Sequence, residues 1–352
     1  MTVSPFDHPL LSALLGDEEA SRHFSVEAEI EAALAFECAL AEAEAENGII
    51  ARDAAAAIVT ALASFRPDTA LLRAGVAKDG VMVPELVRQI RAAVGEPHGD
   101  KVHFGATSQD VIDTSLMLRL KAIVEHIGLL LTETVLRLTS LEERFGGRAL
   151  TGMTRMQPAI PIQVTDRITA WRGPLQRHQE RLSDQARRLL VVQFGGAAGT
   201  LERLGDKVPA VRAALAAKLG LADAPQWQSQ RDTLADFAGW LSLLTGSLGK
   251  FGQDIALMAQ GGTDIALSGG GGSSAMPHKQ NPVKAEALVA LARFNATQLS
   301  GMHQALVHEQ ERSGAAWTLE WLLLPQMVVA TAASLRTALT LLSQINRIGD
   351  PT

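Results

Sequence analysis

One uninterrupted stretch, residues 108–145, constrains the fold more than any other part of the chain. It contains no proline, and apolar residues recur at helical spacing: Ile112, Leu116, Leu120, Ile123, Ile127, Leu131, Leu138 and Leu141. This spacing predicts one continuous helix from Ser108 to Phe145. At 1.5 Å per residue it would be about 55 Å long, which is longer than a compact small domain needs. We therefore expect it to span a helical bundle.

Four further segments have the same pattern and complete the predicted bundle: Ile162–Phe194 with a kink at Gly173–Pro174, Asp232–Gln260, Val283–Glu311, and Trp317–Ile345 bent near Pro325. Before them, Ser25 and Asn47-Gly48 bound a predicted helix, and shorter helices follow, one capped by Asp53 and one running from Pro84 to Gly95. We expect an N-terminal helical domain, 1–105, and a long-helix bundle domain, 106–352.

Composition favours an all-α fold. Hydrophobic residues make up 47% of the chain, aromatic residues only 4%, and tyrosine is absent. A core built from Ala, Leu, Val and Ile suits closely packed helices better than sheets. Leucines and alanines lie on more than one face of the long helices, which is typical of helices that also pack against other subunits. A homo-oligomer is therefore expected.

Charge and cysteine content narrow the possible partners. The net charge of −6 gives no overall positive field, so neither nucleic acid nor an anionic membrane is an expected partner. The single cysteine, Cys38, rules out an internal disulfide and makes no zinc site, which favours the cytoplasm. The N-terminus lacks the pattern of a secretion signal, and the apolar run "WLLLPQMVVATAASL" is interrupted by Pro325, so it is expected to be a buried helix. We expect no metal and no cofactor.

Two of the segments that join the predicted helices carry candidate binding residues. The segment "HFGATSQDVIDT" has two interpretations. In the first, Ser108 is the N-cap of the following helix and Asp110 is an acid that interacts with the helix dipole. In the second, His103, Thr107 and free N–H groups form a cradle for an anion. In "GMTRMQPAIP", Thr154, Arg155 and Gln157 precede an expected proline-bounded helix start. Arg155 is either a solvated surface residue or partly buried between two methionines, where it would demand a carboxylate partner.

A third segment, "GGGGSSAMPHKQNP" at 269–282, is the most specific. Four glycines give mobility, and Pro282 suits the first position of the next helix. A flexible linker would not need Met276, His278 and Lys279 in a fixed order. We expect this loop to close over a substrate, with Lys279, Asn281 and the helix N-terminus supplying positive charge and donors.

These three segments resemble the signature regions of the fumarase/aspartase superfamily: "TSQDVIDT" the first, "GMTRMQPAIP" the second and "GSSAMPHKQNP" the third. The resemblance covers the chain from about residue 5 to its end. It implies an all-α fold with a central long-helix bundle, and a homotetramer whose active sites are assembled from loops of three subunits. Relatives usually continue into a C-terminal helical domain, which is expected to be absent from this chain.

The resemblance also implies roles for individual residues. Ser273 lies where the superfamily has its carbon acid–base. Lys279 and Asn281 match residues that bind the substrate carboxylate and stabilise the carbanion. Four further residues match other binding positions: Thr107, Ser108, Thr154 and Gln157.

Two departures from the pattern indicate a branch of the superfamily. Arg155 stands where adenylosuccinate lyases have a general-acid histidine, and Lys78 in "VAKDGV" replaces a second histidine. Neither residue is a good proton donor, whereas a carboxylate leaving group needs no proton. The chain resembles the branch that lactonizes 3-carboxy-cis,cis-muconate, a small tricarboxylate of protocatechuate breakdown, which also has the Trp and Glu-Trp found in "ERSGAAWTLEWLLLP". Arg155, Lys78, Lys279 and Arg312 would meet its negative charges.

Two alternatives stay open. An adenylosuccinate-type or argininosuccinate-type lyase would need an acid histidine, and Arg155 disfavours it. A non-catalytic structural relative, like the lens crystallins of this superfamily, is disfavoured by the intact "SSAMPHKQNP".

Overall fold

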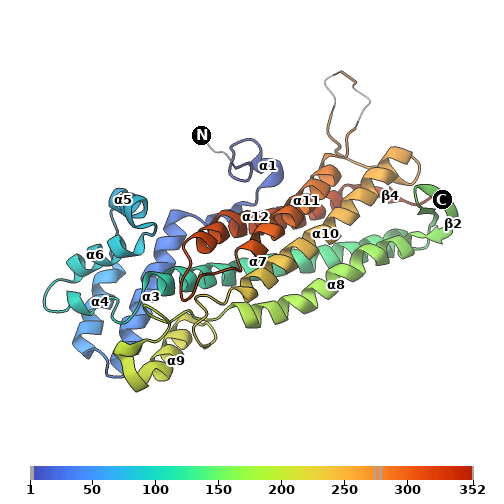
Figure 1. Cartoon of the computed structure of the whole chain (residues 1–352). Coiled ribbons are helices and arrows are strands. Elements are labelled where there is room, and N and C mark those ends of the chain that lie inside the picture. The colour runs from blue at the N-terminus through green and yellow to red at the C-terminus, as the bar shows by residue number, and fades with distance from the viewer. Residues whose placement is uncertain (1–3, 273–274, 277–279, 351–352) are drawn as a thin grey trace.

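The computed structural model describes residues 4–272, 275–276 and 280–350, and helices dominate it (Figure 1). Ser273, Ser274, His278 and Lys279 lie outside the described residues. The N-terminal part contains α1 (Ser12–Leu15), α2 (Glu18–Arg22), α3 (Val26–Glu46), α4 (Arg52–Ala63), α5 (Thr69–Asp79), α6 (Val83–Val94) and the 3₁₀ turn η1 (Gly99–Lys101). The remainder contains α7 (Ser108–Phe145), α8 (Val164–Leu189), η2 (Glu202–Lys207), α9 (Val208–Leu219), α10 (Asp232–Gly261), α11 (Val283–Gln304) and α12 (Ala315–Ser343). The all-α prediction is confirmed.

Helix α7 has the bounds that its sequence pattern predicts. Its N-cap is Thr107, with extended backbone, whereas the simplest interpretation of the sequence gave that role to Ser108. The backbone N–H of Thr107 donates to Oδ2 of Asp110 at 3.0 Å, which satisfies a donor that the helix itself leaves unpaired. The apolar stripe is buried as expected, with Leu120, Ile123 and Ile127 fully inaccessible.

The long helices α7, α8, α10, α11 and α12 pack along one another into an elongated bundle (Figure 1). Pro174 lies inside α8 and Pro325 inside α12, so neither proline ends its helix. Two predicted helices are shorter than expected. The predicted start of α8 at Ile162 is wrong because that residue pairs with Leu150 in a β-hairpin. Helix α11 ends at Gln304 instead of Glu311.

Two short antiparallel sheets were not anticipated from the sequence. Strands β1 (Ala149–Thr154) and β2 (Gln157–Gln163) form a hairpin, and Arg155 and Met156 turn the chain with positive φ values of 47° and 65°. Strands β3 (Ile265–Leu267) and β4 (Ile345–Ile348) pair near its base, where the N–H of Asp350 donates to the carbonyl of Ala149. The proline-bounded helix start expected just after Gln157 is therefore wrong, because residues 157–163 form β2.

The apolar core has two clusters. One fills the bundle, and the other joins α3, α4 and α6 to α9 and to Val111 and Ile112 at the start of α7. The division into domains 1–105 and 106–352 remains a prediction, because the second cluster draws on both ranges. Helix α12 is long and apolar enough to cross a membrane, but 67% of its most apolar 18-residue window is buried inside the protein. It is a core helix, as the interrupted apolar run predicts.

Candidate active site

The first group of predicted site residues lies at the N-terminal end of α7. Thr107 and Ser108 are half-buried there. Arg312, between α11 and α12, joins them because its Nε donates to Oε1 of Gln109 at 3.1 Å. Lys78 is on α5 at the same end of the molecule. Its side chain is 83% exposed, with Nζ 3.8 Å from Oδ1 of Asp79. A charge this exposed can reorient toward an anion at little cost.

Arg312 has no counter-ion among the residues that the structure describes. Besides Gln109, its guanidinium donates through Nη2 to the backbone carbonyls of Gly196 at 3.3 Å and Ala197 at 3.1 Å. These acceptors are neutral, and no carboxylate of the described chain forms an ion pair with Arg312. The protein thus fixes the position of this cation without neutralising it, which suits a site that receives an anion.

Asp110 does more than complement the helix dipole. It is fully buried, and its two oxygens accept hydrogen bonds from the N–H groups of Gly195 and Gly196, at 2.8 and 2.9 Å, and from Nε2 of Gln193 at 3.0 Å. Burial raises the pKa of Asp110 to about 6, against the effect of these donors. Asp110 therefore ties the loop that holds Arg312 to the first turn of α7.

His103 contributes less to an anion cradle than the sequence suggested. Its Nδ1 lies 2.6 Å from Oε1 of Glu37, and both side chains are almost fully buried. Burial alone would lower the pKa of His103, but the attraction of Glu37 outweighs it and the pKa is raised. Because Glu37 balances the charge of a protonated His103, this pair offers no net positive charge to a ligand.

The second group, Thr154, Arg155 and Gln157, lies at the tip of the β1–β2 hairpin. All three residues are exposed. Of the two alternatives for Arg155, one chain by itself agrees with the solvated surface residue and not with partial burial between methionines, since Met153 and Met156 are 49% and 72% exposed. No ion pair to Arg155 occurs among the residues that the structure covers. The hairpin therefore presents an unneutralised guanidinium to the surroundings.

The third group is represented by Asn281, just before α11. The N–H of Asn281 donates to the carbonyl of Gly271 at 2.8 Å, and the reverse bond is 2.9 Å, so the two sides of the loop are paired at its base. A Cβ on Gly271 would lie 2.5 Å from Cγ2 of Val283, which explains a glycine there. Pro282 is the N-cap of α11, one position before the predicted one. The catalytic candidates Ser273 and Lys279 lie outside the described residues.

Within one chain these groups are far apart. Thr107, Ser108 and Arg312 lie at the start of α7, whereas the hairpin follows its end at Phe145. The 38 residues of α7 span about 55 Å. The base of the third loop is also at the hairpin end, because β3 pairs with β4 and Asp350 bonds to Ala149. No single chain can therefore bring all the predicted residues around one small substrate.

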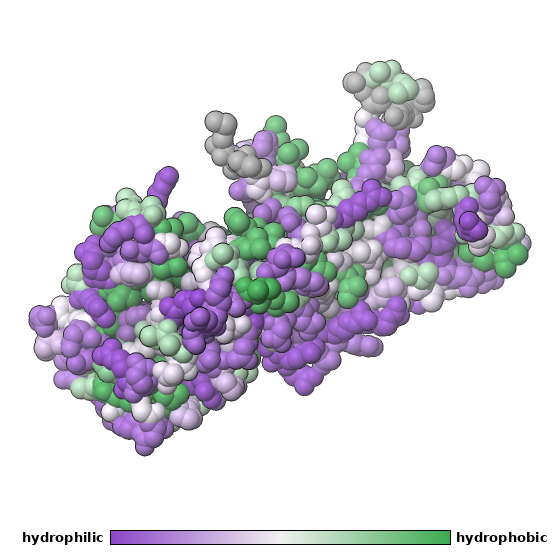
Figure 2. All heavy atoms as spheres, in the orientation of Figure 1, coloured by the Kyte–Doolittle hydropathy of each residue, from purple (hydrophilic) through white to green (hydrophobic). Residues whose placement is uncertain are grey.

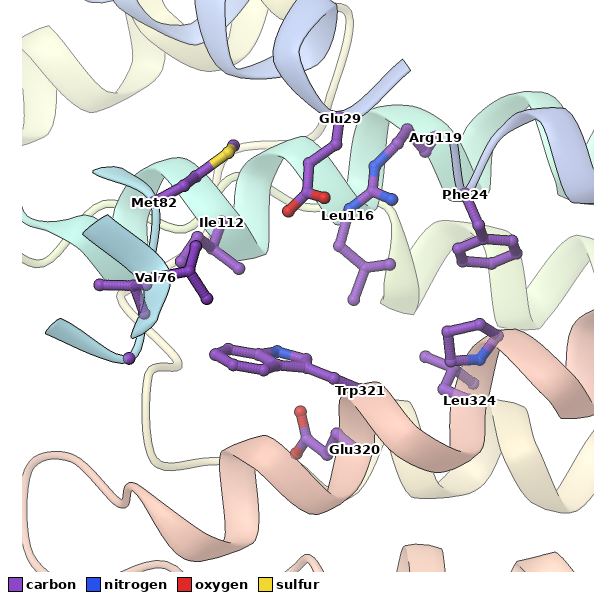
Figure 3. A pocket seen from close by; sticks show the side chains of 13 residues that line it. Phe24, Glu29, Val76, Met82, Ile112, Leu116, Arg119, Glu320, Trp321 and Leu324 are labelled. Atoms are coloured by element: carbon purple, nitrogen blue, oxygen red, sulfur yellow. The ribbon is translucent and has the colours of Figure 1, made fainter. Parts of the chain in front are cut away.

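A cavity of about 380 Å³ opens beside the first group, between the N-terminal helices, α7 and α12 (Figure 3). Most of its lining is apolar, including Ile112, Leu116 and Trp321, with Glu29 and Arg119 on one side. None of the predicted site residues within the described part of the chain lines this cavity. In the described part of the chain, no cluster of three or more His, Cys, Asp or Glu side chains is arranged to hold a metal ion.

Comparison with known proteins identifies the family. Residues 16–295 match the sequence profile of the lyase family. The chain belongs to this family. It is 39% identical to a 3-carboxy-cis,cis-muconate cycloisomerase of Pseudomonas aeruginosa over 327 residues, 91% of this chain and 71% of the relative. A cycloisomerase of the same name from Bradyrhizobium diazoefficiens is 36% identical over 93% of this chain and 74% of its own length. The crystal structure of the 3-carboxy-cis,cis-muconate lactonizing enzyme of Pseudomonas putida superposes with a TM-score of 0.90 at 37% identity, covering 96% of this chain and 77% of that one.

Sequence analysis missed the polar residues beneath the first group. Gln109 and Asp113 are buried on α7. Asp113 accepts hydrogen bonds from Gln109, Arg231 and Trp317, and Arg231 in turn donates to Glu320. The available signal was the spacing of Gln109 and Asp113, four residues apart at the start of an otherwise apolar helix.

Proposed function

We propose that this lyase-family chain converts 3-carboxy-cis,cis-muconate to 4-carboxymuconolactone. The observation that carries the proposal is the presence of two guanidinium groups, Arg155 and Arg312, that no carboxylate of the described chain neutralises. A tricarboxylate substrate supplies the missing negative charges. The substitution of arginine for an acid histidine fits a reaction in which the departing or attacking group is itself a carboxylate. The names of the relatives described above support the same substrate.

In the proposed reaction one terminal carboxylate of the diene attacks the carbon β to the other terminal carboxylate. A C–O bond forms, a five-membered lactone closes, and the π electrons move onto the far carboxylate as an aci-carboxylate. Lys279, Asn281 and the N-terminus of α11 would stabilise this charge, while Thr107, Ser108, Thr154 and Gln157 would orient the substrate. No electrons leave the substrate, so the step needs no redox cofactor.

We assign Ser273 as the donor of the proton to the α-carbon. A serine hydroxyl is a poor acid in water, but N–H donors and Lys279 around a closed, dry site would favour its alkoxide. The serine then recovers a proton from solvent. Three substrate carboxylates become two carboxylates and an ester, so one proton is taken up for each turnover near neutral pH.

Assembly is part of the proposal. We expect a homotetramer in the cytoplasm, with each site built from loops of three subunits. The separation of Arg155 from Arg312 along α7 supports shared sites, since one substrate must contact both groups. Apolar surface supports the association: Figure 2 shows exposed apolar side chains over the middle of the elongated molecule, and Leu129, Leu136, Leu243 and Leu322 on α7, α10 and α12 are each more than half exposed.

The test is loss of diene absorbance with purified protein and 3-carboxy-cis,cis-muconate, together with proton uptake in weak buffer. Ser273→Ala should reduce kcat by at least about 100-fold, which is the usual contribution of a positioned acid–base group. Ser268→Ala is the matched control, because Ser268 lies in the same connection and, among the described residues, bonds only to the carbonyl of Gln344. Near-normal turnover by Ser273→Ala would contradict the assignment. Cleavage of adenylosuccinate with no change in the diene would favour the lyase alternative.

A further inference from the structure

A buried polar network lies directly beneath Arg312, at the end of the bundle where α7, α10 and α12 begin. At its centre is Arg231, the N-cap of α10, which is 2% exposed. Its guanidinium donates to both oxygens of Asp113, at 2.6 and 3.1 Å, and to both oxygens of Glu320, at 2.9 and 2.6 Å. Trp317 adds a hydrogen bond from Nε1 to Oδ1 of Asp113 at 3.1 Å.

Stability alone is a poor explanation for this network. One cation faces two carboxylates, so the group of three carries a net negative charge in the core. Buried ion pairs often contribute no more than apolar residues of the same volume, since taking the charges out of water is costly. For Glu320, burial by itself would raise the pKa, but the hydrogen bonds from Arg231 and the nearness of His308, whose Nε2 lies 3.6 Å from Oε1, outweigh burial and lower the pKa. The carboxylate is therefore held in its charged form.

The network reaches the candidate site through one amide. Nε2 of Gln109 donates to Oδ2 of Asp113 at 3.1 Å and to the carbonyl of Gln228 at 2.7 Å. With both N–H groups committed to these acceptors, Oε1 of Gln109 must face the other way, where it accepts from Nε of Arg312 at 3.1 Å. If Asp113 moved, the amide could turn over and direct N–H groups at a cation. The position of Asp113 thus contributes to the orientation of the amide that accepts from Nε of Arg312.

We propose that Arg231 is a positioning residue for substrate binding: by clamping Asp113 and Glu320 it fixes the Gln109 amide, which in turn aims the guanidinium of Arg312 at a substrate carboxylate. The inference rests on the proposed function for the role of Arg312. Arg231 itself is buried and touches no substrate, so its effect passes entirely through Arg312. A positioning role for Arg231 therefore requires Arg312 to be present, whereas a general contribution of Arg231 to folding would not.

A double-mutant cycle between Arg231→Lys and Arg312→Met tests the inference. Arg231→Lys keeps the charge of the network but replaces the fork that holds two carboxylates with a single ammonium. The readouts are KM and kcat for 3-carboxy-cis,cis-muconate, and the calorimetric Kd for propane-1,2,3-tricarboxylate, which does not require turnover. We expect Arg231→Lys to raise KM and Kd about tenfold with a smaller change in kcat, and to have no further effect on Kd when Arg312 is already methionine.

Gln109→Met is the second variant, since it removes the amide link and leaves the contacts of Arg231 with both carboxylates in place. Gln109→Met should also raise Kd about tenfold, and it should not raise Kd further when it is combined with Arg312→Met. Arg212→Lys, at the surface pair of Arg212 with Asp223, is the matched control and should change neither constant. Equal effects of Arg231→Lys in both backgrounds, or no effect in either, would overturn the inference. A wild-type protein that binds the tricarboxylate but does not consume the diene would refute the proposed function and leave the inference standing.

Discussion

The backbone N–H of Gly196 donates to Oδ2 of Asp110 at 2.9 Å, and the carbonyl of the same glycine accepts from Nη2 of Arg312. Asp110 belongs to the first turn of α7, so one glycine residue connects the start of this long helix to the unneutralised guanidinium. The orientation of Arg312 therefore depends on groups that the substrate does not reach. This arrangement leads to the first of four predictions.

Asp110→Asn should destabilise the protein and weaken substrate binding. The carboxylate accepts from Gly195, Gly196, Gln193 and the N–H of Thr107, whereas asparagine has one acceptor oxygen and would point N–H groups at donors. We expect a loss of about 2 kcal/mol in the free energy of unfolding, because hydrogen bonds are lost while the cost of burying a charge is relieved. Urea unfolding measures this change in the free energy of unfolding. Asp68→Asn at the exposed cap of α5 is the control, and an equal loss in both variants would contradict the prediction.

Glu44→Gln should change how stability depends on pH. Glu44 is buried on α3 and neither of its carboxylate oxygens has a hydrogen-bond partner in the described structure. Burial raises its pKa to about 9, with a further contribution from Glu37. A folded-state pKa above the unfolded value means that Glu44 favours the folded state below about pH 4.5, and that this contribution is lost as the pH rises toward 9.

The variant and the wild type should therefore be similar in stability at pH 5, and the variant should be the more stable at pH 8. The difference should grow by up to about 1.4 kcal/mol per pH unit, the limit for one proton. Urea unfolding from pH 5 to 8 at one protein concentration measures it. Parallel curves for the two proteins over this range would show that Glu44 titrates at an ordinary pKa.

Arg155→Met and Arg312→Met should each be nearly inactive but should complement each other. The two residues lie beyond opposite ends of α7, so a shared site takes them from different subunits. After the two variants are dissociated, mixed in equal amounts and reassembled, random association gives intact versions of both residues in about a quarter of the sites. Turnover of the diene by the mixture measures this recovery. A mixture no more active than its components would show that both residues must come from one chain.

Leu136→Arg should disrupt the assembly without unfolding the chain. Leu129 and Leu136 are seven residues apart on one face of α7 and are 66% and 57% exposed, which is unusual for leucines of a bundle helix unless another surface covers them. Sedimentation should detect smaller species and the assay a loss of activity, with the circular dichroism unchanged. Leu10→Arg serves for comparison. Leu10 is 78% exposed near the N-terminus, and its substitution should change neither the assembly nor the activity. Intact assembly of Leu136→Arg would place the interface elsewhere.

The helices could be predicted from the sequence because their apolar periodicity is strong and their ends carry local signals. Helix α7 has the predicted bounds, and α3 lies between the predicted Ser25 cap and Asn47. The β1–β2 hairpin could not be predicted in this way, because its turn at Arg155 and Met156 has positive φ values but contains no glycine or asparagine to mark it. Its pairing depends on contacts between segments, such as that of Leu150 with Ile162, instead of on local propensity.

The candidate site was predictable only in part for a related reason. Motifs identify residues that would face a ligand, such as Thr107, Arg155 and Asn281. The support beneath them involves residues far apart in sequence: Arg231 meets Asp113 across 118 positions and Glu320 across 89. No local pattern in one sequence marks such a partnership. The role of Arg312 also changed in detail, because its contacts with Gly196 and Ala197 appear only in three dimensions.

In the proposed shared site, helix α7 acts as a spacer that keeps one polypeptide from completing a catalytic centre by itself. On this proposal a newly synthesised chain is inert toward its substrate until it finds its partners, and specific activity should decline when the enzyme is diluted below the concentration at which subunits separate. Turnover is in this way linked to the abundance of the protein as well as to its chemistry.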